Sequence, residues 1–234
     1  MNKIFVKTKN VKNFIALTKR LKSKPENVPK MSLVFGEPGL GKSHTAIWWA
    51  VRNEAVYIRC SNNMSSRWLL DNLVENLGEV AHYSTSDLMK QAEHLLIETP
   101  TVLIIDEIDH ILNSGKVIET VRDIYDKTNT PIILMGMNKA DKKLKYYRHI
   151  YDRVSEIVKF EPFSFDEIKN IVDQLSEVQI EEDAINMIYQ SSNRLRQVVS
   201  LISRAEELAR ANNIKSVNAE LLKNGANKLI EDKQ

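Results

Sequence analysis

A glycine-rich segment near residue 40 constrains the fold of this 234-residue chain more than any other feature. An apolar run at 31–35 reads as a strand and leads into it, and a helical pattern follows. The segment is Gly36-Glu37-Pro38-Gly39-Leu40-Gly41-Lys42-Ser43, with His44 next. Glycines let the backbone wrap a phosphate chain, and the N–H groups at a helix start favour anionic oxygens. We therefore predict a strand–loop–helix ATP site formed by residues 36–44, in which Lys42 reaches the β and γ phosphates and Ser43 ligates Mg²⁺.

Strand and helix patterns alternate through the first 160 residues and then change. Predicted strands lie at 31–35, 55–60, 101–105, 131–135 and 156–160. Alternation of this kind implies a five-stranded parallel sheet with helices on both faces, an α/β fold. After about residue 163 the patterns are helical, without further strands. We therefore predict a basic helical lead-in over 1–30, an α/β nucleotide-binding domain over 31–162 and a small helical domain over 163–234.

Two acids follow the most apolar of the predicted strands. The residues at 102–105 are all aliphatic, and Asp106 and Glu107 come directly after them. We predict that Asp106 supports the Mg²⁺ shell and that Glu107 acts as the general base for an attacking water. A small-molecule kinase has no need of a base that activates water, so the pair indicates hydrolysis of ATP.

Three further polar residues are candidates for contacting and sensing the γ-phosphate of ATP. Asn138 follows a predicted strand, where it could orient the water or only support a turn. Arg153 precedes the last strand and could act as an arginine finger toward a neighbouring subunit, with Arg148 as its competitor. Arg196 opens a helix of the C-terminal domain and could reach the γ-phosphate, with Arg194 as the alternative. For each of these arginines, the alternative is a solvated surface residue.

Composition limits the remaining function classes. Hydrophobic residues make up 43% and charged residues 27% of the chain, as in folded globular proteins. No run of about 18 apolar residues occurs and the N-terminus lacks a signal-peptide pattern, so we expect no membrane partner. The single cysteine, Cys60, fits a cytoplasmic location. A net charge of only +2 means that any nucleic-acid site must be a local patch.

In this order, the loop, the acidic pair and the three sensor candidates resemble the AAA+ ATPases. The resemblance implies a sheet of order 5-1-4-3-2 and a helical lid domain. It also implies a ring or helical filament with ATP between neighbouring subunits.

Within the AAA+ ATPases, the chain most resembles the group that includes phage Mu transposition protein B and the transposon C-type ATPases. The segments that carry this resemblance are 35–46, 55–60, 68–77 and 103–112, and 5–11 is similar to that group's lead-in to the ATPase core. It implies a protein that binds duplex DNA without sequence preference, selects target sites and stimulates a transposase. The Mu protein has an N-terminal helix-turn-helix domain, for which the residues before Met31 are too few, so we expect DNA contacts from the ATPase core.

Two basic patches are candidates for those DNA contacts. Arg59 and Arg67 flank a polar loop at 61–66, and they are the preferred candidates. The second patch, 139–153, begins with Lys139 and combines six basic residues with three tyrosines, which suits a nucleic-acid backbone and bases. Its alternative is a solvated loop that presents Arg148 or Arg153 to the next subunit. The adjacent Trp48 and Trp49 are expected in the core.

Two other functions share the same nucleotide site. One is a helicase loader or replication initiator of the AAA+ class. The other is an ATP-gated scaffold in which hydrolysis is incidental.

Overall fold

The computed structural model describes residues 1–192 and 194–224. The end of the last predicted helix, which begins near 217, lies outside the described residues. In chain order the elements are α1 (Lys9–Ser23), β1 (Met31–Gly36), α2 (Lys42–Asn53), β2 (Val56–Arg59), α3 (Ser66–Asn76), α4 (Thr85–Glu98), β3 (Leu103–Asp106), the short 3₁₀ helix η1 (Ile108–His110), α5 (Gly115–Thr128), β4 (Ile132–Gly136), α6 (Ala140–Leu144), α7 (Arg148–Tyr151), β5 (Val154–Phe160), α8 (Phe165–Leu175), β6 (Gln179–Ile180), α9 (Glu182–Ser191), α10 (Leu195–Ala211) and β7 (Ser216–Val217).

The five longer strands form one parallel sheet. Their order is β2-β3-β4-β1-β5, which is the predicted order 5-1-4-3-2 counted from the other edge. Every residue of β3 and β4 is buried, because helices cover both faces at the centre of the sheet. Strand β5 alternates exposed and partly buried residues, as an edge strand does. The predicted α/β fold is confirmed, and its parallel strands bring the ends of β1, β3 and β4 to one edge.

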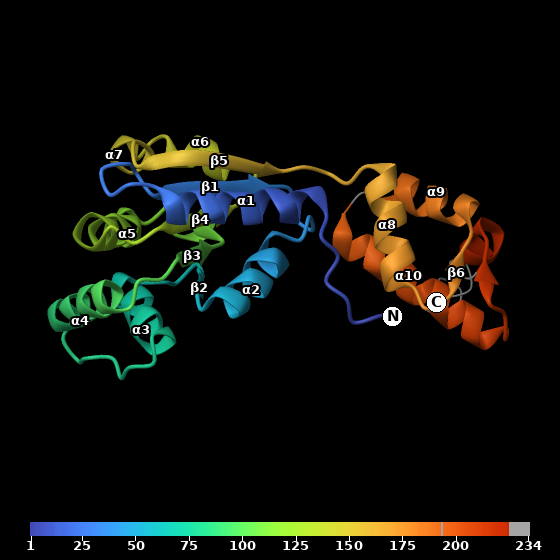
Figure 1. Cartoon of the computed structure of the whole chain (residues 1–234), viewed down its shortest axis with the longest axis horizontal. Helices are drawn as coiled ribbons and strands as arrows, with labels where there is room; N and C mark the ends of the chain where they lie inside the picture. The colour runs from blue at the N-terminus through green and yellow to red at the C-terminus, as the bar shows by residue number, and fades with distance from the viewer. Residues whose placement is uncertain (193, 225–234) are drawn as a thin grey trace. The chain divides into compact units, whose positions relative to one another are not determined.

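Different helices cover the two faces of this sheet (Figure 1). A buried cluster joins strand residues such as Ile105 and Leu134 to α3, α4 and α5. On the other face α1 contacts α2, where the Phe14 and Trp49 ring centroids are 6.1 Å apart.

The expectation for the tryptophan pair is half wrong. Trp49 is buried, but Trp48 is partly exposed, with the Arg52 guanidinium 4.7 Å from its ring centroid. Neighbouring residues on a helix point about 100° apart, so the two rings cannot both face the sheet.

The chain forms two compact units. The α/β unit contains Asn13–Glu37 and Lys42–Phe160, and the helical unit contains Met1–Lys12, Pro38–Gly41 and the chain from Glu161 onward. The predicted boundary at 162/163 remains a prediction.

The helical unit has a core of its own, built mainly by α8, α9 and α10. Ser164 and Glu167 form a capping box that starts α8. The absence of strands from this part was predicted wrongly, because β6 and β7 pair in parallel. Two-residue strands are too short to leave an alternating pattern in the sequence.

Among the described residues, no helix has the length and apolarity needed to span a bilayer.

Candidate nucleotide site

The loop at 36–43, which we call the phosphate-binding loop, has a backbone that depends on glycine. Gly39 and Gly41 both have a φ of +85°, in the left-handed region that side chains disfavour. Gly36 lies against the edge strand, since a Cβ added there would be 2.7 Å from the Phe160 carbonyl oxygen. The glycine spacing seen in the sequence is therefore required by this turn.

Lys42 places a buried cation inside the loop. Its Nζ donates to the carbonyl oxygens of Gly36 at 2.7 Å and Glu37 at 2.8 Å. Burial lowers the pKa of this ammonium, and the carboxylate of Asp106 opposes the shift. Helix α2 begins at Lys42, so its first N–H groups lie at the same point, with His44 exposed in the first turn. A buried ammonium beside a helix N-terminus favours an anionic ligand.

Asp106 is held at the end of β3 with 2% of its surface exposed. One of its oxygens accepts from the Tyr57 hydroxyl at 2.7 Å, and the other accepts from the Glu107 N–H at 2.7 Å. Burial and this carboxylate raise the pKa of Tyr57, while a hydrogen bond with Ser43 lowers it. Tyr57 therefore links the two predicted Mg²⁺-binding residues. The sequence analysis missed it, because a tyrosine inside a strand has no motif of its own.

Glu107 follows in a left-handed backbone conformation, with φ of 56°. Its carboxylate pairs with the Arg59 guanidinium at 2.6 Å, and the His110 ring lies 3.6 Å away. The hydrogen bond from Arg59 lowers the pKa of Glu107. Glu107 is thus ionised, as a general base must be, and it already has a partner on β2.

Asn138 lies beside the phosphate-binding loop, as a γ-phosphate sensor would. Its amide donates to the Glu37 carboxylate, across the ends of β4 and β1. Asp109 accepts from the Met137 N–H at 2.6 Å and holds the start of this segment. A Cβ on Gly136 would lie 2.8 Å from an Asp109 oxygen, so glycine is needed where β4 ends.

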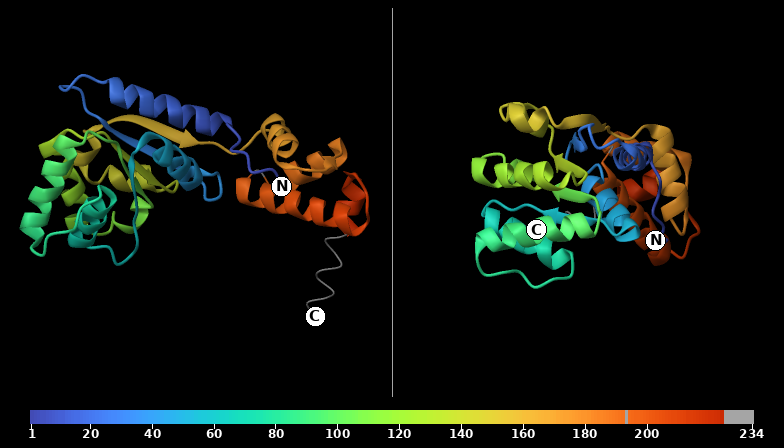
Figure 2. Two further views of the ribbon diagram at one scale, coloured as in Figure 1. Left: turned by 60° about the horizontal axis from the view of Figure 1, so that its bottom comes forward. Right: turned by 60° about the vertical axis from the view of Figure 1, so that its left-hand side comes forward.

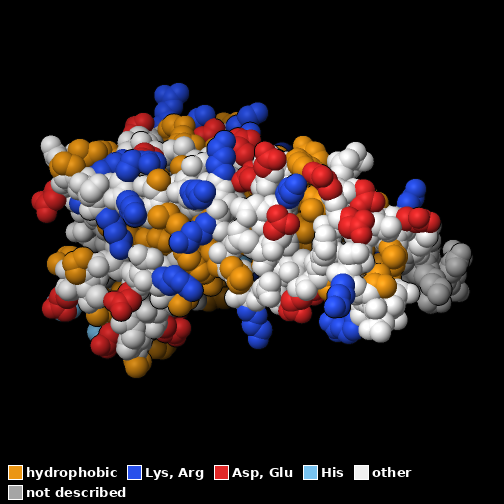
Figure 3. All heavy atoms as spheres, turned by 45° about the vertical axis from the view of Figure 1, so that its right-hand side comes forward, with side chains coloured by type: hydrophobic (Ala, Val, Ile, Leu, Met, Phe, Trp, Pro, Cys, Tyr) orange, Lys and Arg blue, Asp and Glu red, His pale blue; other side chains and the backbone are white. Residues whose placement is uncertain are grey.

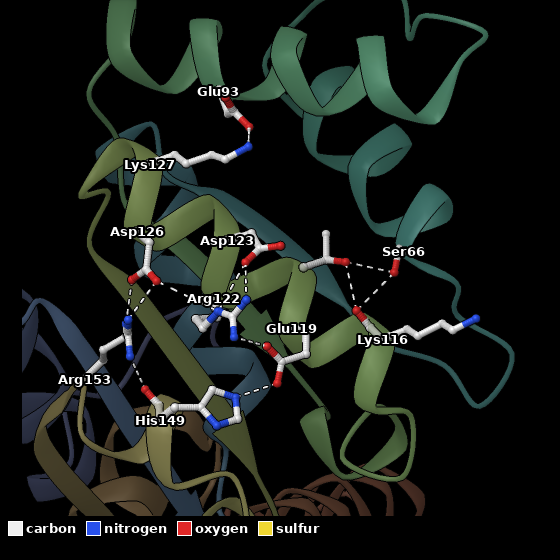
Figure 4. Close-up of polar contacts among 11 residues, drawn as sticks. Ser66, Glu93, Lys116, Glu119, Arg122, Asp123, Asp126, Lys127, His149 and Arg153 are labelled. Atoms are coloured by element: carbon white, nitrogen blue, oxygen red, sulfur yellow. Dashed lines mark hydrogen bonds and ion pairs between the residues drawn. The ribbon is translucent and has the colours of Figure 1, made fainter.

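Arg153 lies in the turn between α7 and β5, where it joins a cluster of charged side chains from α5 and α7 (Figure 4). Its guanidinium makes two contacts with the Asp126 carboxylate, at 2.5 and 2.7 Å, and donates to the His149 carbonyl oxygen. The His149 ring contacts Glu119 at 2.5 Å, and Glu119 pairs with Arg122. Arg153 is therefore fixed in orientation at the surface of the α/β unit, and its role as a finger remains a prediction.

Among the other predicted basic residues, Arg67 has local partners. It pairs with Asp71 at 3.4 Å and donates to backbone carbonyl oxygens of the loop between α3 and α4. Lys139 and Arg148 are exposed. The DNA roles of Arg59, Arg67 and Lys139 remain predictions.

Two arginines flank the start of α10 in the helical unit. Arg196 is exposed on its first turn. Arg194 packs against the loop segment that belongs to the same unit, since a Cβ on Gly39 would lie 3.3 Å from the Arg194 Cβ. Arg194, the alternative to Arg196, is thus the arginine that lies against the loop, and a role of either in contacting the γ-phosphate remains a prediction.

Comparison with known proteins gives one family and one curated relative. The family described as "AAA domain" matches residues 27–144, half of the chain. A "Potential ATP-binding protein" from Staphylococcus aureus is 24% identical over 139 residues, which cover 55% of this chain and 51% of that protein. The chain thus spans about half the length of this relative.

Several solved structures share the fold. The Aeropyrum pernix ORC2 protein in its ADP form has a TM-score of 0.75 at 15% identity, covering 96% of this chain and 69% of that chain. Drosophila ORC bound to DNA has a TM-score of 0.67 at 18% identity, covering 97% and 63%. The Thermotoga maritima RuvB Holliday junction branch migration motor has a TM-score of 0.64 at 21% identity, covering 95% and 69%.

These structural identities show a common fold alone, and the predicted resemblance to transposition ATPases remains a hypothesis. The family match covers the phosphate-binding loop, the acidic pair and Asn138. Taken with the sheet order, it shows that the chain belongs to the AAA domain family, the AAA+ ATPases.

Proposed function

We propose that this protein hydrolyses ATP to ADP and phosphate. The observation that carries the proposal is the convergence of Lys42, Asp106 and Glu107 at the ends of β1 and β3. Lys42 supplies a buried positive charge for the phosphates, and Glu107 supplies an ionised carboxylate. A binding loop alone would need the first of these charges but not the second.

The residues present fit Mg²⁺ bound together with a nucleotide. Ser43 and Asp106 offer oxygen donors, the type that Mg²⁺ prefers. Within the described part of the chain, no group of three or more His, Cys, Asp or Glu side chains could hold a metal unaided. An Mg²⁺ ion would therefore need phosphate oxygens as further ligands, and when bound it would neutralise the charge developing on them.

Glu107 would take the proton from the attacking water, and Asn138 would orient that water. For this, the Glu107 carboxylate must leave Arg59, to which it is bound at 2.6 Å. Rearrangement of this pair is therefore part of the proposed reaction cycle.

We further propose that Arg153 of a second copy of the chain contacts the γ-phosphate of the ATP bound to the first copy. The support for the proposal is the position of Arg153 directly before β5, at the surface of the α/β unit. The γ-phosphate would have to replace Asp126, with which the guanidinium makes a bidentate contact. Mixing Lys42→Ala protomers with Arg153→Ala protomers tests it, since a shared site regains turnover when each protomer supplies what the other lacks. No recovery, or recovery with Arg148→Ala in place of Arg153→Ala, would reject Arg153 as the finger.

More specifically, we propose that the protein assembles on duplex DNA in an ATP-dependent way. In this state it would select transposition targets and stimulate a transposase. The support is the sequence resemblance to the Mu protein B group. A helicase loader or replication initiator is the second candidate, favoured by the likeness to the ORC proteins. A scaffold with incidental hydrolysis is the third.

Electron microscopy with duplex DNA and a slowly hydrolysed ATP analogue tests the assembly step. We expect rings or filaments on DNA with the analogue and none with ADP. No nucleotide-dependent assembly would reject both DNA-acting functions. Pull-down of a transposase would then support the first candidate, and pull-down of a replicative helicase would support the second.

A further inference from the structure

Positive charge is concentrated at the start of this chain. Residues 1–30 contain nine basic residues and one acidic residue, whereas the whole chain has a net charge of +2. Helix α1 contains no acidic residue. The lead-in is therefore a local positive region on an otherwise balanced protein.

The packing of α1 turns this charge outward. Phe14, Leu17 and Leu21 lie on one face of the helix and are fully buried. Lys12 and Lys19 are seven positions apart, which places them on one line of the opposite face, and both are exposed. Across the described residues, the structure gives neither of them an ion pair. Their charge is therefore available to a partner.

The neighbouring helix α2 extends the same surface. Lys22 lies over the Trp49 ring, with Nζ 5.2 Å from the centroid, and Arg52 lies over Trp48. The contact between Lys22 and Trp49 joins α1 to α2, whereas the contact between Arg52 and Trp48 lies within α2. We call the outer surface of the two helices the α1–α2 surface: Lys19, Arg20, Lys22, Trp48 and Arg52. Lys and Arg side chains gather around hydrophobic ones on this face of the α/β unit (Figure 3).

In the part of the chain that the structure describes, one carboxylate pairs with cations of this region and partly offsets their charge. Glu156 on β5 pairs with Arg20 at 2.7 Å and with Lys24 at 3.1 Å. Figure 2 shows α1 running beside β5, and the contact with Glu156 lies at the C-terminal end of the helix. One carboxylate shared by two cations leaves an excess of positive charge, and the Arg20 side chain is still 54% exposed.

We propose that the α1–α2 surface binds the phosphate backbone of duplex DNA. A helix of 15 residues is about 22 Å long, the length of six or seven base-pair steps. Cations repeated along such a length match the repeating charge of a duplex and need no base contacts. The apolar face of α1 is buried in the protein, so the helix has no face left to insert into a membrane.

This inference rests on the proposed DNA binding. It places the main DNA contact on the α1–α2 surface and not on Arg59 and Arg67. Arg59 and Arg67 each have a carboxylate partner, at 2.6 and 3.4 Å, which a phosphate would have to displace. Within 1–192 and 194–224, the residues that the structure describes, Lys19 has no carboxylate partner that a phosphate would have to displace. The α1–α2 surface is thus a better electrostatic match for the DNA backbone than Arg59 and Arg67.

Salt titration of duplex binding tests the assignment. We compare wild type with three double variants of exposed lysines: Lys19→Gln/Lys22→Gln on α1, Lys139→Gln/Lys142→Gln in the other predicted patch, and Lys90→Gln/Lys116→Gln as the matched pair, which lies in neither patch. Binding of a fluorescent duplex is measured with the ATP analogue between low and moderate salt. Each lost phosphate contact lowers the slope of log K against log salt by about 0.9, so we expect a decrease of roughly 1.8 for the α1 pair. We expect no such decrease for the matched pair.

Three outcomes overturn the inference, and they differ in what else they reject. If wild type does not bind the duplex, the proposed DNA function fails as well. If wild type binds and only the Lys139→Gln/Lys142→Gln pair lowers the slope, the contact lies at 139–142 and this inference alone fails. If the α1 pair lowers binding to phosphatidylserine vesicles but not to DNA, the surface recognises a membrane. Melting temperatures and nucleotide binding equal to wild type confirm that the variants are folded.

Discussion

The nucleotide site and the α1–α2 surface use positive charge in opposite ways. In the nucleotide site the single lysine is buried, bound to two carbonyl oxygens and surrounded by carboxylates. On α1 the lysines are exposed, repeated and held by few partners. A buried charge acts through one geometry and is little affected by salt, whereas exposed charges act by number and are screened. The first arrangement suits chemistry on one ligand, and the second suits adhesion to a polymer.

We expect the largest effect from replacing Glu107, the proposed general base. Glu107→Gln keeps the shape but removes the proton acceptor, so ATP turnover should fall by about 10²–10⁴-fold. Binding of a fluorescent ATP analogue should be retained. Phosphate release and analogue binding are measured on the same preparation. Unchanged turnover would remove Glu107 as the base and favour the scaffold function.

Lys42→Ala removes the buried cation. Because this charge acts on the phosphates in a site with little water, we expect kcat/KM for ATP to fall by roughly 10²–10³-fold. Lys139→Ala is the control, since it removes an exposed lysine of the same unit and should leave turnover unchanged. Equal losses in both variants would mean that the effect comes from general charge and not from the site.

Gly36→Ala tests the tight turn that shapes the loop. The new Cβ would meet the Phe160 carbonyl oxygen at 2.7 Å, so we expect a loss of stability of about 1–3 kcal/mol. Gly115→Ala is the matched control, because nothing lies within 4 Å of a Cβ there. Denaturant unfolding measures both. A Gly36 variant as stable as the control would show that the contact between β1 and β5 can relax.

The smallest effect is expected from Arg59→Ala. Arg59 lowers the pKa of Glu107, so it keeps the carboxylate ionised at lower pH. Without Arg59 the pKa of Glu107 rises, so the acid limb of the profile of kcat/KM against pH should move to higher pH. At neutral pH the freed carboxylate should support equal or faster turnover. An acid limb that moves to lower pH would contradict the pairing.

The positions of the strands, the glycine turn and the acidic pair could all be predicted, because each leaves a local signal. The order of the strands in the sheet was implied only by the resemblance to the AAA+ ATPases. Glycines at 36, 39 and 41 and an aliphatic strand before Asp106 are properties of short segments. Tyr57 and the partner of Arg59 could not be predicted in this way. They depend on the register of β2 against β3, in which Arg59 lies opposite Asp106.

The arginines and α1 show the same difference between features that have a local sequence signal and features that depend on tertiary contacts. The sequence by itself determined the α/β fold and the basic, amphipathic character of the lead-in, and it predicted a nucleotide-binding domain over 31–162. Only the tertiary structure decided which charges are already neutralised: Arg59 by Glu107, Arg153 by Asp126, and Arg20 by Glu156. The physical reason is that periodicity and glycine spacing act within a few residues. An ion pair joins side chains that are far apart in the chain, and it exists only once packing has brought their elements together.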